Sequence, residues 1–111
     1  MKWITAYVRP HRLDDIRQAL ALVGISGLTV IETLGTGKPG WVEVYRGAEY
    51  HRDVEPMCSV ELMIADELSD QVIEAICNIA RTGKSGDGKI LVRELQEIHR
   101  IRTGEQGSGA L

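Results

Sequence analysis

The chain has 111 residues, of which 43% are hydrophobic and 26% charged, and it carries a formal net charge of −3. This is the size and composition of one folded domain, and an acidic chain lacks the concentrated basic surface of a general nucleic-acid binder. No apolar run approaches the ~20 residues of a membrane-spanning helix, and the N-terminal residues show no secretory signal pattern, so we expect a cytoplasmic protein with a single domain over residues 1–111 and no membrane insertion.

Two β-α-β patterns follow one another along the chain. Segments of alternating apolar residues, typical of half-buried strands, take turns with segments whose apolar residues recur at helical spacing. They predict strands over 1–8, 28–33, 58–64 and 89–95, and helices over 13–23, with Gly24 as a left-handed cap, and 69–79, with Ser69 as N-terminal cap. This order predicts a ferredoxin-like βαββαβ sandwich of the α+β class, with four antiparallel strands and both helices on one face.

The second face of such a sheet has no cover within one chain. The sequence contains no Phe and only two Trp, so a single chain offers few large side chains for its core. Packing the open face against other copies of the chain would complete the burial. We therefore expect an oligomer.

A connection of about twenty residues, from about 35 to 55, separates the two patterns. Connections of this length inside a small domain are usually functional or disordered. This one contains four glycines, a proline and the aromatic residues Trp41, Tyr45 and Tyr50. Exposed aromatic residues on such a loop indicate contact with a partner; a poorly ordered hairpin without function is the alternative.

The densest chemical signal is the glycine-rich segment 82–89. It fits the Gly-x4-Gly-Lys opening of a phosphate-binding loop, but Ile90 stands where the NTPase motif has the Ser or Thr that holds Mg²⁺. A helix also precedes it and a strand follows, the reverse of the NTPase order. Closely spaced glycines still allow backbone N–H groups to converge on an anion, with Lys84 or Lys89 adding charge. We interpret the segment as an anion-binding loop; a tight turn without a ligand is the alternative.

A second basic group consists of Arg100 and Arg102, whose two-residue spacing would place them on one face of an extended segment. Alone they are typical of a solvated edge strand. Together with the loop 82–89, and with Lys38 beside the glycines that open the long connection, they point to a nucleotide polyphosphate as the ligand.

Catalytic signals are sparse. The three histidines, His11, His51 and His99, have no metal-ligand spacing, and no Ser–His or Cys–His pair is recognisable. We expect neither an enzyme nor a metal site. A nucleotide-hydrolysing enzyme is the alternative from another class, although the sequence offers no evident general base for it.

Several stretches together resemble the PII signal-transduction protein family, from Met1 to about Glu105. They are Arg9-Pro10 followed by Leu13-Asp14-Asp15, Gly24-Ile25 to Val30, Tyr45-Arg46-Gly47-Ala48-Glu49-Tyr50, Thr82 to Ile90, and Arg100 to Glu105. The Tyr-Arg-Gly-Ala-Glu-Tyr hexapeptide and the Gly-Asp-Gly-Lys loop are specific to that family.

The resemblance implies a homotrimer whose sheets face inward, with ATP or ADP, and AMP as a further candidate, in clefts between subunits. It places Thr29, Met63 and Glu61 near the adenine, the backbone of Gly86, Asp87 and Gly88 at the phosphates, Lys89, Arg100 and Arg102 as the cations, and Thr36, Gly37 and Lys38 at the base of the long loop. The phosphate-binding loop would span about 82–89 and the C-terminal tail about 101–111. The long loop, about 35–55, would be the family's T-loop, which docks into a transporter, an enzyme or another regulated protein. Tyr50 matches a tyrosine that some members carry uridylylated; a contact residue that is never modified is the alternative.

The sequence departs from the family where members that sense 2-oxoglutarate bind it. The Gln that helps to hold Mg²⁺ and the effector is absent from the segment 37–41, which is one residue shorter, and Met57 replaces the effector-binding Lys. Each lost charge-assisted contact costs about 1.5–3 kcal/mol. We therefore expect a PII-like regulator with another effector, a small anion such as bicarbonate, and the need for Mg²⁺ stays open. The alternative is an ordinary nitrogen-regulatory PII protein that senses ATP, ADP and 2-oxoglutarate, with Tyr50 as its modification site.

Overall fold

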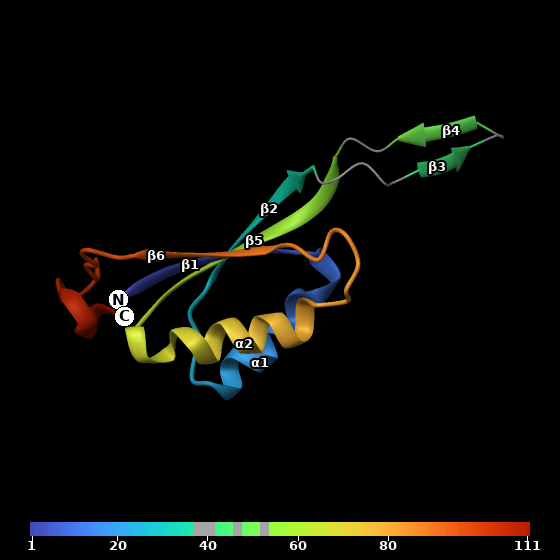
Figure 1. The fold of residues 1–111 in the computed structure, drawn as a ribbon. Coiled ribbons are helices and arrows are strands. Elements are labelled where there is room, and N and C mark those ends of the chain that lie inside the picture. Colours follow the sequence, from blue (N-terminus) through green and yellow to red (C-terminus); the bar gives the residue numbers. More distant parts are fainter. Residues whose placement is uncertain (37–41, 46–47, 52–53) are drawn as a thin grey trace.

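The computed structural model describes residues 1–36, 42–45, 48–51 and 54–111 (Figure 1). Its strands and helices are β1 (Lys2–Val8), α1 (Leu13–Leu22), β2 (Thr29–Gly35), β3 (Val42–Tyr45), β4 (Ala48–His51), β5 (Glu55–Ile64), α2 (Ser69–Ala80) and β6 (Lys89–Glu94). Short 3-10 turns at Pro10–Arg12 and Asp66–Leu68 lead into the two helices, and a third spans Gly107–Ala110.

One antiparallel sheet contains β2, β5, β1 and β6 in that order, and α1 and α2 cover one of its faces (Figure 1). Each helix connects two strands that are separated in the sheet by a third strand, as two interleaved β-α-β units require. This confirms the predicted ferredoxin-like α+β fold. β3 and β4 form a separate two-stranded sheet.

The core lies between the sheet and the two helices. Every second side chain from Ile4 to Val8 in β1 and from Cys58 to Ile64 in β5 is buried, and these side chains pack against apolar residues of α1 and α2. The buried set is Ile4, Ala6, Val8, Cys58, Val60, Leu62 and Ile64 from the strands, and Ile16, Leu20, Val72 and Ile76 from the helices. The period-two alternation in the sequence therefore identified the core face correctly.

Some boundaries differ from the prediction. β2 extends to Gly35 and β5 begins at Glu55, because the two strands continue to pair beyond the alternating segments. Ser69 is the first residue of α2 and makes no capping hydrogen bond, since the helix continues directly from the preceding 3-10 turn. Gly24 does adopt the predicted left-handed conformation, with φ +87°, and Ile25 N–H closes the end of α1 by donating to Leu20 O at 2.9 Å.

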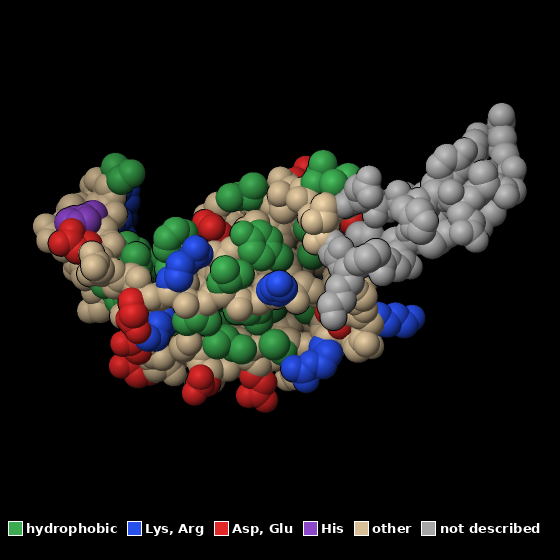
Figure 2. All heavy atoms as spheres, turned by 45° about the horizontal axis from the view of Figure 1, so that its top comes forward, with side chains coloured by type: hydrophobic (Ala, Val, Ile, Leu, Met, Phe, Trp, Pro, Cys, Tyr) green, Lys and Arg blue, Asp and Glu red, His purple; other side chains and the backbone are tan. Residues whose placement is uncertain are grey.

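The sheet face opposite the helices is uncovered in the chain. Tyr7, Ile31, Met63 and Leu91 lie on it, each about 40–50% exposed. Figure 2 turns this side of the molecule partly toward the viewer and shows hydrophobic side chains gathered among Lys and Arg side chains. The predicted open face is therefore present, and it carries exposed apolar side chains together with charged ones.

Candidate functional site

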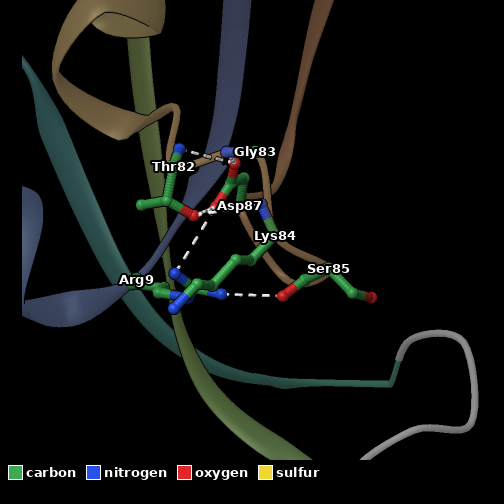
Figure 3. A network of polar contacts seen from close by, with 6 residues as sticks. All are labelled: Arg9, Thr82, Gly83, Lys84, Ser85 and Asp87. Carbon is green, nitrogen blue, oxygen red and sulfur yellow. Dashed lines mark hydrogen bonds and ion pairs between the residues drawn. The ribbon is translucent and has the colours of Figure 1, made fainter.

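The segment between α2 and β6 is a loop built around one carboxylate. Asp87 accepts hydrogen bonds from Thr82 N–H at 2.7 Å, from Gly83 N–H at 2.9 Å and from the Thr82 hydroxyl (Figure 3). The bond from the Thr82 hydroxyl, followed by that from its backbone N–H, holds the pKa of Asp87 below its ordinary value. The side chain of Asp87 therefore shapes the loop from within.

Arg9 ties this loop to the end of β1. Its Nη2 donates to Ser85 O at 2.7 Å, and its Nη1 lies 3.4 Å from Asp87 Oδ1 (Figure 3). Arg9 belongs to one of the stretches that resemble the PII family, but it was not predicted as a site residue. The strand register explains its position: Tyr7 pairs with Lys89, so the residues after Tyr7 run alongside those before Lys89.

Gly88 is required where the loop joins β6. Its φ is +107°, and a Cβ on it would lie 1.7 Å from Tyr7 O and 2.8 Å from Tyr7 C. No side chain fits there without moving the backbone of β1. Gly83 and Gly86 also have positive φ, at +81° and +95°, so the glycines of the predicted anion-binding loop do support conformations that other residues rarely adopt.

The base of the long connection lies at the same end of the sheet as this loop. β1 and β2 run in the same direction on either side of β5, and the loop 82–88 precedes β6, whose first residue pairs with Tyr7 near the end of β1. Thr36 follows β2 directly and is exposed there. The predicted partners Gly37 and Lys38 lie outside the described residues. Tyr50 lies in β4, opposite Glu43.

The three residues predicted near an adenine gather on the uncovered sheet face. Thr29 pairs with Glu61 across β2 and β5, and Met63 follows two positions along β5 on the same face, 40% exposed. The hydroxyl of Thr5 donates to Glu61 Oε1 at 3.4 Å and accepts a hydrogen bond from Arg93 Nη2. The structure therefore brings these three predicted residues together.

The two predicted cation groups lie at opposite ends of the sheet. Lys89 begins β6 beside the glycine loop, whereas Arg100 and Arg102 follow the far end of β6 (Figure 1). The extended segment predicted for the two arginines is wrong, because the chain turns after Arg100, where Gly104 N–H donates to Arg100 O at 2.8 Å. The six residues of β6 alone span about 20 Å at ~3.3 Å per residue. One phosphate chain cannot reach from the loop to these arginines within a single chain.

A pocket of about 290 Å³ opens beside the glycine loop, on the helix side of the sheet. Its lining includes apolar side chains of α2 and the ends of β1 and β6, together with Asp87, Gly88 and Lys89. A second pocket of about 430 Å³ lies at the start of the long connection and includes Glu32, Leu34, Met57 and Cys58. Neither contains Thr29, Glu61, Arg100 or Arg102, so neither is by itself the predicted nucleotide site.

The described part of the chain contains no group of three or more His, Cys, Asp or Glu side chains placed to hold a metal ion. Among the same residues, no helix has both the length and the apolar character needed to cross a membrane.

Comparison with known proteins gives consistent matches over the whole chain. A family model described as nitrogen regulatory protein P-II matches residues 1–105. The nitrogen regulatory proteins P-II of Pasteurella multocida and Haemophilus influenzae are each 49% identical over 112 positions, and the nitrogen regulatory protein GlnK of Escherichia coli K12 is 48% identical; each match covers 100% of both chains. The 112 aligned positions exceed the 111 residues of this chain by one, so each alignment includes a position without a counterpart here.

Proposed function

The chain belongs to the nitrogen regulatory protein P-II family of signalling proteins, and on that premise we propose that it binds ATP or ADP between copies of itself and regulates a partner protein through its T-loop, residues 35–55. In this proposal three copies of the chain form a homotrimer, as the family resemblance implies, and their uncovered sheet faces are directed inward. The apolar residues on those faces would then be buried between subunits.

One observation carries this proposal: the glycine loop and the tail arginines lie at opposite ends of the same sheet (Figure 1). A polyphosphate that contacts both groups must therefore take them from two different copies. The loop 82–89, with Lys89, is proposed to hold the phosphates from one subunit, and Arg100 and Arg102 to approach from its neighbour.

The remaining predicted contacts complete the proposed site. Thr29, Glu61 and Met63 share one patch of the open face, where an adenine can lie against Met63 and Glu61 can accept a hydrogen bond from it. At the phosphate end, Thr36, Gly37 and Lys38 are proposed to close the site from the base of the T-loop. Gly86, Asp87 and Gly88 would present their backbone N–H groups to the phosphates.

The nucleotide proposal is tested by calorimetry with ATP, ADP and AMP, each with and without Mg²⁺. Lys89→Ala and Arg102→Ala should weaken binding of ATP, because each removes a charge-assisted contact worth about 1.5–3 kcal/mol, or roughly ten- to a hundredfold in affinity. Arg17→Ala is the matched control, since Arg17 lies on α1 and pairs there with the nearby Asp14 at 3.6 Å. Absence of nucleotide binding by the wild-type protein would overturn the proposal.

A mixing experiment tests whether the site is shared between subunits. Lys89→Ala chains have an intact tail and Arg102→Ala chains have an intact loop, so a site formed between the two kinds of chain can be wild-type in both parts. Co-expression of the two variants should restore roughly a quarter of the wild-type sites at random assembly. If no binding is restored although mixed oligomers form, the loop and the arginines do not form a nucleotide site shared between subunits.

We further propose that the second effector is not 2-oxoglutarate but a smaller anion such as bicarbonate. Met57 lies opposite Thr33 at the start of β5, and its Cγ is 3.1 Å from where a Cβ on Gly35 would lie. An uncharged side chain thus fills the position where the resemblance expects an ammonium group. The extra position in the alignments agrees with the shortened segment 37–41. Tight binding of 2-oxoglutarate in the presence of Mg²⁺ and ATP would overturn this proposal, whereas Met57→Lys should increase that binding.

The names of the relatives favour a second candidate. All three relatives described above are named nitrogen regulatory proteins, which supports an ordinary sensor of 2-oxoglutarate with Tyr50 as its modification site. Mass spectrometry of the protein from nitrogen-limited and nitrogen-replete cells distinguishes the two: a uridylyl group on Tyr50 under limitation supports the second candidate.

A further inference from the structure

The tail after β6 is a closed turn. Gly104 N–H donates to Arg100 O at 2.8 Å, and Arg100 N–H donates to Glu105 O at 2.9 Å. Gly107 N–H then donates to Ile98 O at 3.1 Å, and His99 pairs with Gln106. These contacts bring Glu105 back beside Arg100 and fix their backbones relative to each other.

Within this turn the guanidinium of Arg100 is already engaged. Its Nη1 donates to Glu105 Oε1 at 2.9 Å, and its Nη2 donates to Leu111 O at 3.1 Å. The Thr103 hydroxyl donates to the same Glu105 oxygen at 3.1 Å. Because the turn and Thr103 already orient the carboxylate, the pair forms with little further loss of side-chain freedom.

We propose that Glu105 is a specificity-determining residue that weakens the attraction of Arg100 for phosphate in proportion to the charge of the nucleotide. The inference rests on the proposed function, in which Arg100 is a phosphate ligand. A guanidinium has five N–H donors, so Arg100 can keep its pair with Glu105 and still contact a phosphate. The carboxylate then lies next to the incoming anion and repels it.

This repulsion grows with ligand charge, because the Coulomb energy is proportional to the product of the charges. ATP is therefore penalised more than ADP, and ADP more than AMP. The side chains of Arg100 and Glu105 are 36% and 47% exposed, so solvent screens the effect and keeps it within the range of surface ion pairs. Removing the charge should tighten ATP binding by about two- to fivefold and AMP binding hardly at all.

The test is calorimetric titration of the full chain with ATP, ADP and AMP at low ionic strength. The variants are Glu105→Gln and the matched control Glu97→Gln, which removes one carboxylate from the same segment; Glu97 pairs with His99 at 3.2 Å and not with Arg100. Glu105→Gln should raise affinity in the order ATP, ADP, AMP, and Glu97→Gln should not. The gain should shrink at about 1 M salt, where the Debye length is ~3 Å.

Two further variants separate charge from folding. In an Arg100→Ala background, Glu105→Gln should give a smaller gain, because the guanidinium that pairs with the carboxylate and brings the phosphate next to it is gone. If Glu105→Gln disturbs the tail, as seen by circular dichroism, Thr103→Val provides a second test: it releases the carboxylate from one hydrogen bond and should give a smaller gain in the same order of ligands.

The outcomes distinguish this inference from the function on which it rests. If the wild-type protein binds no nucleotide, the proposed function fails. If it binds ATP but Glu105→Gln leaves the ratio of ATP to AMP affinity unchanged or lowers it, the role of Glu105 is refuted while the nucleotide site stands.

Discussion

Gly88 lies directly against the backbone of Tyr7 in β1, and its replacement by alanine should destabilise the protein strongly. The φ of +107° costs a non-glycine residue about 1–3 kcal/mol. The added Cβ would also lie 1.7 Å from Tyr7 O, so the backbone must move and weaken the pairing of Tyr7 with Lys89, at about 1 kcal/mol per hydrogen bond lost. We expect a total loss of about 2–4 kcal/mol, which for a chain of this size lowers Tm by roughly 8–16 °C.

The assay is thermal unfolding by circular dichroism at one protein concentration and without nucleotide, because ligands and assembly also shift Tm. Gly83→Ala is the matched control: Gly83 has φ +81° in the same loop, but a Cβ there would meet no atom within 4 Å. Gly83→Ala should lose about 1–2 kcal/mol of stability, which is the cost of the positive φ alone. Equal losses for the two variants would refute the claim that contact with β1 makes Gly88 necessary.

Three further variants test the contacts around the loop and the open face. Arg9→Ala should speed amide hydrogen exchange across residues 82–87 by releasing Ser85 O and Asp87, while lowering overall stability by less than about 1 kcal/mol. The pKa of Asp87 is depressed in the folded state, so the stabilisation of the loop by its carboxylate is complete above the ordinary pKa of 3.8 and is lost as the pH falls through the lower folded pKa. Asp87→Asn should therefore abolish this acid dependence of amide exchange in the loop. Arg93→Ala should cost about 0.5–1 kcal/mol in urea unfolding, since the guanidinium lies 3.8 Å from the ring centre of Trp3.

The sequence predicts the arrangement of the main sheet well because its strands follow one simple rule. Alternation identified the core faces of β1 and β5, and the two β-α-β patterns sufficed for the topology. The rule of alternation failed to predict the start of β5, because Pro56 interrupts the alternation although β5 has already begun at Glu55. The pairing of β5 with β1 ends at Cys58, so Pro56 pairs with β2 only, and a proline is tolerated at such an edge position. The short strands β3 and β4 also lie in a segment that was predicted as a loop.

In the candidate site, the contacts that could not be predicted join residues outside the local clusters seen in the sequence. Glycines and lysines of the loop 82–89 are visible as a local cluster, but Arg9 reaches Ser85 across 76 positions of sequence, and only the pairing of β1 with β6 reveals that contact. Arg100 was identified as a cation, whereas its pair with Glu105 was missed. The five-residue spacing with Thr103 and Gly104 between them is a turn signal that could have indicated it.

In the proposed site, nucleotide binding and subunit assembly are linked, because the loop and the arginines come from different copies. A nucleotide that binds only the assembled protein stabilises it by RT ln(1 + [L]/Kd), about 2.7 kcal/mol at a hundredfold excess over Kd. Lys89→Ala should lose most of this ligand-dependent gain and keep the stability of the free protein, since Lys89 is exposed at the start of β6. Gly88→Ala should instead lower the stability of the free protein. The neighbouring residues Gly88 and Lys89 thus separate a position that shapes the loop from one that is proposed to hold the ligand.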